Sequence, residues 1–360
     1  MITERGHSIC FVSRGLGHGY AVLDAAIGDQ LKLSDPNLNL TFVSYGTGAT
    51  TLKELGWNVI DLQLPEDNSL WENILGISRA IHEQRPSLVI SHDECAAIPI
   101  AKTLGVPGVF LTDWFVDSLY WNMQALQYAE EILFLDEPGY YDEPAYLKGK
   151  IRYCGSVFRN LAIDEADRLL WRSRRNIPVD STMILVVPGG AESQSEIRAP
   201  LYDLVLDAFD VLPSINKRLV WVVGKPDYDI LSARSRERLD ITILEPDYDD
   251  ITSTLATADV VITKENCISL AECGALGVPS ISISFAGNTI YDYRAIRIPT
   301  NIPLRVNGID RTVLCHYIVT ALAMPRDRKC SMSTDTSRGR LVVAETLRGY
   351  IRRATVPLAT

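Results

Sequence analysis

The sequence lacks the usual marks of membrane-spanning, exported and nucleic-acid-binding proteins. No apolar run approaches the roughly 20 residues that a helix needs to cross a bilayer. The N-terminal segment MITERGHSICFVSRG has no charged region followed by a long apolar run, as a signal peptide would. The formal net charge of -10 argues against the basic face that a general nucleic-acid binder needs. We therefore expect a soluble cytoplasmic protein with no nucleic-acid partner and no integral membrane segment.

Motifs for metal binding and covalent catalysis are also missing. The seven cysteines are scattered, odd in number and without CxxC spacing, which favours small core residues in a reducing compartment. Neither a GxxxxGK phosphate loop nor a GxSxG nucleophile elbow occurs. Two aspartate-rich runs, Asp227–Asp229 and Asp247–Asp250, are expected in loops before helices, where aspartates serve as caps. The sequence therefore predicts no metal site.

The sequence does contain a regular alternation of short apolar runs and helical segments. Unbroken apolar runs of this length are typical of strands buried on both faces of a parallel sheet. In the first half the predicted strands are Ile9–Ser13, Leu40–Ser44, Asn58–Leu62, Ser87–Ser91, Gly108–Leu111 and Ile132–Leu135. After a connector near residue 158 they are Met183–Val187, Arg218–Val223, Asp240–Leu244, Val260–Thr263 and Ser280–Ser284. This alternation predicts an α/β fold with doubly wound parallel sheets in two similar halves.

A glycine-rich turn follows the first predicted strand and leads into a helix. Gly15 and Gly17 allow backbone N–H groups to approach a ligand closely, and the helix dipole favours negative charge there. His18 in this turn is either a solvated or capping residue or a base, because an imidazole that titrates near neutrality can take a proton from an attacking hydroxyl. Tyr20 stands where the dinucleotide-binding fingerprint needs its third glycine, so a dehydrogenase is disfavoured.

The stretch from Thr257 to Ile283 reads as strand, turn, helix, turn and strand. Asn266 stands at the N-cap position of a helix predicted over Cys267–Leu276. Gly277 follows that helix and can adopt the left-handed conformation that commonly ends one. Glu272 lies inside the apolar stripe of that helix. It either snorkels to water at the edge of the stripe or accepts two neighbouring hydroxyls of a ribose.

The run from Ala258 to Pro279 resembles, without a gap, the nucleotide-binding segment of GT-B glycosyltransferases, above all the N-acetylglucosaminyltransferases that form lipid II. In that family the helix glutamate holds the ribose of the donor, and its position falls on Glu272. The resemblance implies a GT-B fold, in which two Rossmann-like doubly wound parallel-sheet domains face each other across a cleft. It divides the chain into an N-terminal acceptor-binding domain (1–158), a C-terminal donor-binding domain (159–336) and a last helix (337–360) that can return to the first domain.

The same resemblance implies that His18 is a general base assisted by a carboxylate. The turn sequence GLGH is similar to the N-terminal loop of GT-B transferases, several families of which use this histidine to deprotonate the acceptor. Asp93 follows the predicted strand LVIS at the same sheet edge and corresponds roughly to the acid that orients the base. The assignment can slip to His92 or Glu94, and Asp113 is the other candidate. Alternatively, Asp93 caps the next helix.

Donor binding is assigned by the resemblance to the second half of the chain. The expected contacts are Gly189 and Gly190 on the diphosphate, Leu244 beside the base, Lys264, Asn266 and Cys267 at the nucleotide helix, Glu272 on the ribose and Asp292 on the sugar. Two features depart from the family pattern. Glu265 brings a negative charge beside the diphosphate that the resemblance implies, and Ser193 arrives later than the serine of the family's loop. The sequence therefore does not decide how tightly the donor binds or which nucleotide diphosphate it carries.

The resulting hypothesis is an inverting, metal-independent glycosyltransferase with no cofactor. Its partners are a nucleotide-diphosphate sugar, most simply a UDP-sugar, and a small-molecule, glycan or lipid acceptor. The sequence leaves open whether the protein forms a homodimer. The aromatic stretch 114–121 either packs in the core or forms an acceptor pocket or lipid-facing patch. One alternative is a nucleotide-sugar hydrolase or epimerase on the same fold. The other is a non-catalytic nucleotide-sugar-binding or regulatory subunit, motivated by Glu265.

Overall fold

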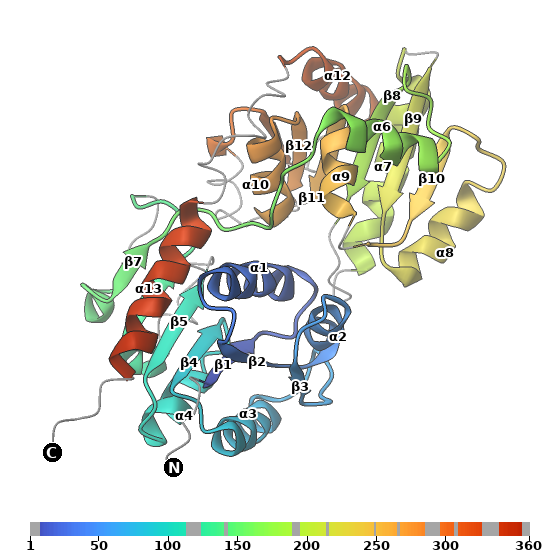
Figure 1. The fold of residues 1–360 in the computed structure, drawn as a ribbon. Coiled ribbons are helices and arrows are strands. Elements are labelled where there is room, and N and C mark those ends of the chain that lie inside the picture. Colours follow the sequence, from blue (N-terminus) through green and yellow to red (C-terminus); the bar gives the residue numbers. More distant parts are fainter. Residues whose placement is uncertain are drawn as a thin grey trace, which may run out of the picture. The chain divides into compact units, whose positions relative to one another are not determined.

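The computed structural model describes residues 8–112, 124–139, 143–188, 195–213, 216–247, 250–264, 267–284, 296–305, 309–325 and 338–354. These residues form two parallel sheets flanked by helices, as the alternation of strands and helices predicts (Figure 1). The chain divides into two compact units. The first contains Met1–Asn160 together with Ser337–Thr360, and the second contains Leu161–Thr336.

The first unit contains seven parallel strands in the order β3-β2-β1-β4-β5-β6-β7. The strands are β1 (Ser8–Ser13), β2 (Asn39–Ser44), β3 (Val59–Asp61), β4 (Leu88–His92), β5 (Gly108–Thr112), β6 (Glu131–Phe134) and β7 (Ile151–Tyr153). The helices are α1 (Gly19–Ser34), α2 (Gly46–Glu54), α3 (Leu70–Gln84), α4 (Ala97–Thr103), η1 (Gln124–Tyr128), η2 (Ala145–Leu147) and α13 (Arg338–Ala354). Helices α1 and α13 cover one face of this sheet, and α3 and α4 cover the other (Figure 1).

The C-terminal helix α13 is an integral part of the first unit. It packs against α1 and β4, and its apolar face includes Val343 and Leu347, both 0% exposed. The Tyr350 hydroxyl donates a hydrogen bond to Oε2 of Glu131 in β6 (3.1 Å). At its N-terminal end, a Cβ on Gly339 would lie 2.3 Å from the carbonyl oxygen of Ser156. At this position the helix backbone therefore lies directly against the backbone of the chain just beyond β7.

The second unit contains six parallel strands in the order β10-β9-β8-β11-β12-β13. The strands are β8 (Thr182–Val187), β9 (Lys217–Val222), β10 (Ile241–Leu244), β11 (Val260–Lys264), β12 (Ser280–Ser284) and β13 (Asn301–Arg305). The helices are α6 (Glu165–Arg174), α7 (Ser195–Val211), α8 (Lys225–Arg234), α9 (Ile251–Thr257), α10 (Cys267–Leu276) and α12 (Arg311–Leu322). Helices α7 and α12 pack together, as do α9 with α6 and with α10.

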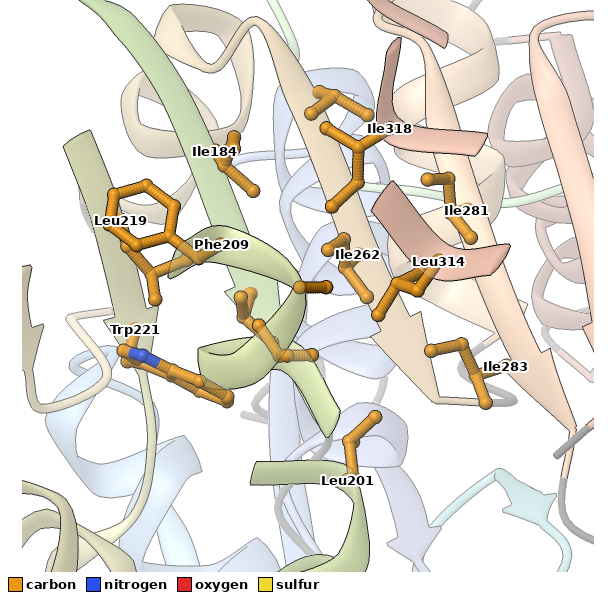
Figure 2. Packing of buried hydrophobic residues seen from close by; sticks show 14 of the residues in the cluster. Ile184, Leu201, Phe209, Leu219, Trp221, Ile262, Ile281, Ile283, Leu314 and Ile318 are labelled. Carbon is orange, nitrogen blue, oxygen red and sulfur yellow. The ribbon is translucent and has the colours of Figure 1, made fainter. Parts of the chain in front are cut away.

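The core of the second unit lies between its sheet and the pair α7 and α12. Figure 2 shows Leu314 and Ile318 of α12 beside the β-branched side chains of β11 and β12, while Phe209 of α7 lies by Leu219 of β9. Trp221 of β9 is fully buried and meets the Tyr202 ring edge-on, with centroids 5.2 Å apart. Most of the core side chains of β11 and β12 are β-branched, because such residues fit the pleated surface of a sheet that is buried on both faces.

Two strands were not predicted from the sequence. β7 has three residues at the edge of the first sheet, in a stretch interpreted as a connector. β13 contains Pro303, which lacks the N–H of a ladder bond, and it is accommodated because β13 is an edge strand. The aspartate-rich run Asp227–Asp229 is also corrected: it lies within α8 and not in a loop.

Candidate functional site

Three of the predicted site residues, His18, Asp93 and Lys264, follow or end strands at the switch point of a sheet. In the first sheet β1 pairs with both β2 and β4, so the loops after β1 and β4 diverge to opposite faces. In the second sheet β8 occupies the same place between β9 and β11. Ligands of open α/β sheets bind in the crevice that forms where strand order reverses. His18 and Asp93 follow β1 and β4, and Lys264 ends β11.

The loop after β1 is built closely against the loop after β2. A Cβ on Gly15 would lie 2.4 Å from both the ring and the carbonyl oxygen of Tyr45, so no side chain fits there. The N–H of Gly48 donates to the Gly15 carbonyl (3.1 Å). Gly17 has φ +64°, a left-handed conformation that glycine adopts at little cost. These contacts explain the glycine-rich sequence and place His18 at the N-cap of α1.

His18 is held by a residue that sequence analysis did not identify. Its Nδ1 atom lies 2.8 Å from Oγ1 of Thr51 in α2. The Thr51 side chain is 0% exposed, and its hydroxyl donates to the carbonyl oxygen of Thr47 (2.9 Å). Burial lowers the pKa of His18 from its ordinary value of 6.5, and the nearby Glu66 carboxylate opposes that shift. A neutral imidazole is therefore favoured at neutral pH.

Glu66 contacts the glycine-rich turn directly. Its Oε1 atom accepts a hydrogen bond from the N–H of Gly17 (3.3 Å). Its Cγ lies against Gly46, where a Cβ would approach it to 2.8 Å. The loop between β3 and α3 thus brings a negative charge beside the turn that carries His18.

Asp93 lies at the end of β4 with its backbone in the left-handed region, φ +53°. It is 6% exposed, and its N–H donates to the Leu111 carbonyl (3.2 Å). Asp93 is not the N-cap residue of α4, because that position is Ala96, which makes no side-chain cap bond. The role of Asp93 as the acid that orients His18 stays a prediction, and so do its alternatives Glu94 and His92. Asp113 lies outside the described residues.

The residues flanking Asp93 are engaged in buried polar contacts. Nδ1 of His92 lies 2.6 Å from Oδ1 of Asp24, with both side chains 0% exposed, and this pair ties β4 to α1. The Tyr45 hydroxyl donates to Oε1 of Glu94 (2.7 Å). Burial raises the pKa of Glu94, and the bond from Tyr45 acts in the opposite direction. Asn73 also approaches the Tyr45 oxygen (3.5 Å), so the first turn of α3 adjoins this network.

The second unit places Lys264 and Glu272 on consecutive elements. Lys264 is 6% exposed and lies in register with Ile283 of β12. The helix α10 matches its predicted bounds and ends at Gly277, where φ is +63°. Glu272 is 1% exposed, so the snorkelling alternative is wrong. Burial raises the pKa of the adjacent Cys273 thiol, and the Glu272 carboxylate adds to that shift. The ribose contact of Glu272 stays a prediction.

The other predicted donor contacts are described in part or not at all. Leu244 ends β10, and its carbonyl accepts the N–H of Val223 (3.0 Å). The strand order places β10 three positions from β11, which is about 14 Å at ordinary strand spacing. Four predicted contacts lie outside the described residues: Gly189, Gly190, Asn266 and Asp292. Cys267 begins α10, and its side chain is likewise outside them. Their roles stay predictions.

The described residues contain no group of three or more His, Cys, Asp or Glu side chains that could hold a metal ion. Asp250 precedes α9 but makes no cap bond. It accepts from Trp171 Nε1 (2.8 Å) and pairs with Arg175, so its role differs from the predicted cap. Among the helices described, none is both long and apolar enough to pass through a bilayer. The aromatic stretch 114–121 lies outside the described part of the chain.

Comparison with known proteins places these features in context. No protein-family model matches the chain. It is 22% identical over 299 residues, 79% of the chain, to the UDP-N-acetylglucosamine--N-acetylmuramyl-(pentapeptide) pyrophosphoryl-undecaprenol N-acetylglucosamine transferase of Fusobacterium nucleatum, and covers 80% of that relative. A second transferase of that name, from Carboxydothermus hydrogenoformans, is 24% identical over 289 residues, and the match covers 75% of each chain.

Solved structures show the same architecture. The fold matches MurG of Acinetobacter baumannii with a TM-score of 0.60 and 15% identity, over 96% of this chain and 99% of that one. It also matches a UDP-GlcNAc 2-epimerase of Methanocaldococcus jannaschii in complex with UDP-GlcNAc and UDP, with a TM-score of 0.63 and 14% identity over 95% and 99% of the two chains. The GT-B fold, the resemblance to the lipid II-forming family and the glycosyltransferase class are therefore confirmed.

Proposed function

We propose that the chain is an inverting glycosyltransferase that moves a sugar from a UDP-sugar to an acceptor hydroxyl. The observation that carries this proposal is the position of His18. It lies at the switch point of the first sheet, beside α1, on a loop that admits no side chain at Gly15. The transferases similar in sequence support the choice of donor.

In the proposed reaction His18 takes the proton of the acceptor hydroxyl as the acceptor oxygen bonds to the anomeric carbon. The bond between that carbon and the diphosphate oxygen breaks, and its electron pair leaves on the nucleotide diphosphate. Lys264 offsets the charge of the leaving group, and backbone N–H groups at a helix N-terminus add to this, so no metal is needed. Glu272 accepts the ribose hydroxyls. The first unit binds the acceptor and the second the donor.

Two substitutions test these roles separately. His18→Ala should lower kcat by roughly 10²- to 10⁴-fold, the usual contribution of a general base, while UDP binding measured by calorimetry stays unchanged. Glu272→Ala should instead raise the donor KM and weaken UDP binding. Wild-type turnover in His18→Ala would remove the base assignment. An unchanged donor KM in Glu272→Ala would remove the ribose assignment.

A second candidate is a nucleotide-sugar epimerase or hydrolase, favoured by the fold shared with the UDP-GlcNAc 2-epimerase. Incubation with UDP-sugars and no acceptor distinguishes the two activities. Free sugar released in stoichiometric amounts would indicate hydrolysis, and an altered sugar still attached to the nucleotide would indicate epimerisation. Tighter UDP binding by Glu265→Ser, with neither variant nor wild type active on a broad panel, would indicate the non-catalytic binder.

A further inference from the structure

We propose that Thr51 is a positioning residue that holds His18 in the tautomer with its proton on Nδ1, so that Nε2 is the atom that takes the proton of the acceptor. This inference rests on the proposed function and adds a residue to it. Thr51 lies 33 positions along the chain from His18, in a different helix.

The direction of the bond follows from counting hydrogens. A threonine hydroxyl has one hydrogen and two lone pairs. The hydroxyl of Thr51 donates that hydrogen to the carbonyl oxygen of Thr47 (2.9 Å), a bond that threonine commonly makes inside helices. At His18 the same oxygen must then accept, which places the hydrogen of this 2.8 Å contact on Nδ1. The neutral ring consequently has its lone pair on Nε2.

The same arrangement persists through a catalytic cycle. When Nε2 takes a proton the ring becomes an imidazolium, in which both nitrogens are donors. The bond from Nδ1 to Thr51 is therefore present before and after proton transfer. With the opposite polarity, Nε2 would already carry the hydrogen, and protonation of Nδ1 would break the contact. Only the tautomer with its proton on Nδ1 can act as a base at Nε2 and keep its hydrogen bond to Thr51 throughout.

The elements on both sides of the bond are held independently of it. The carbonyl of His18 accepts the N–H of Val22 (3.1 Å) as α1 begins, and the N–H of Gly48 fixes α2 to the Gly15 carbonyl. Thr51 is fully buried, so water does not compete for its hydroxyl. The two helices also pack together. The bond therefore orients the ring on a backbone that is already in place, as a precisely positioned base requires.

The tautomer can be measured without any activity. In protein labelled with ¹⁵N-histidine, two-bond correlation spectra above the pKa of His18 distinguish a protonated from an unprotonated ring nitrogen, and loss of one signal set in His18→Ala assigns the residue. We expect a pyrrole-type shift at Nδ1 and a pyridine-type shift at Nε2. Thr51→Val, which replaces the hydroxyl by a methyl group, should shift the ring toward the Nε2–H form. An Nε2–H ring in the wild type would overturn the proposal.

Enzyme kinetics provides a second test of the role of Thr51. Thr51→Val should lower kcat roughly 10- to 100-fold, part of the 10²- to 10⁴-fold that a general base contributes, with the donor KM unchanged. Thr51→Ser keeps the hydroxyl and should restore most of the rate. Thr50→Val makes the same change at the exposed neighbouring position and should match the wild type. Thermal melts check that each variant folds.

The outcomes separate this inference from the proposed function. Wild-type kcat in Thr51→Val, or no rescue by serine, would show that the bond does not serve catalysis. If the wild type transferred sugar from no donor, the proposed function would fail, whereas the spectra would still decide whether Thr51 sets the tautomer.

Discussion

At the scale of single residues, the protonation of His18 depends on two opposing influences. Burial lowers its pKa and the Glu66 carboxylate raises it. A general base acts when neutral, so activity should rise with pH through this pKa, which lies below 6.5. Glu66→Gln removes the charge but keeps an oxygen for the Gly17 N–H, so the pKa should fall further. We expect the acid limb of the kcat/KM profile to move to lower pH.

Asp67→Asn is the matched control for this experiment, because it removes one negative charge from an exposed neighbour in the same loop. Its profile should coincide with that of the wild type. An acid limb that stays in place, or moves to higher pH, in Glu66→Gln would contradict the account of the His18 pKa.

Around the turn after β1 in the first unit, the sequence predicted some residues of the site and missed others, for one physical reason. His18, Gly15 and Gly17 belong to one local motif, whose types and spacing are visible along the chain. Thr51 and Glu66 reach the turn from 33 and 49 positions away, and neither belongs to a pattern. Only the fold could identify them.

At the scale of elements, α13 should contribute directly to the stability of the first unit. Leu347 is 0% exposed on its buried face, and Leu347→Ala removes that contact and leaves a cavity. We expect a loss of about 2–5 kcal/mol in the free energy of unfolding, measured by denaturant titration. Leu341→Ala makes the same change on the same helix at a residue that is 40% exposed, and should cost much less. Equal losses in the two variants would contradict the observed packing of α13.

The central strands were predicted from their apolar runs, whereas two of the edge strands, β7 and β13, were missed. α3 lies between two of the predicted strands, β3 and β4, and begins with a capping box between Ser69 and Glu72. β7 has three residues with few apolar neighbours, and β13 contains a proline. Edge strands need less burial than central ones, so their sequences are less marked.

At the scale of the whole molecule, the proposed donor should stabilise one unit in particular. Lys264 and Glu272 both belong to the second unit, so UDP should raise the melting temperature of that unit. Free UDP at 100 times its Kd stabilises the state that binds it by about 2.7 kcal/mol. In differential scanning calorimetry, Leu347→Ala identifies the transition of the first unit. A UDP-induced shift confined to that transition would contradict donor binding by the second unit.

The overall architecture was predicted because alternation of strands and helices is a property of the entire sequence. Two parallel sheets followed from it directly. The loops after the strands could not be derived in the same way, since a loop's conformation depends on neighbours from other strands, as Gly15 depends on Tyr45.

The membership of α13 in the first unit has a consequence for biosynthesis. The second unit is one uninterrupted stretch of chain, whereas the first needs residues from both sides of it. On a ribosome, the second unit can complete its core as soon as its last strand and helix emerge. The first unit must wait with the face formed by α1 and β4 uncovered until α13 is made. The earlier part of the chain therefore finishes folding last, and its nascent form is the one we expect chaperones to hold.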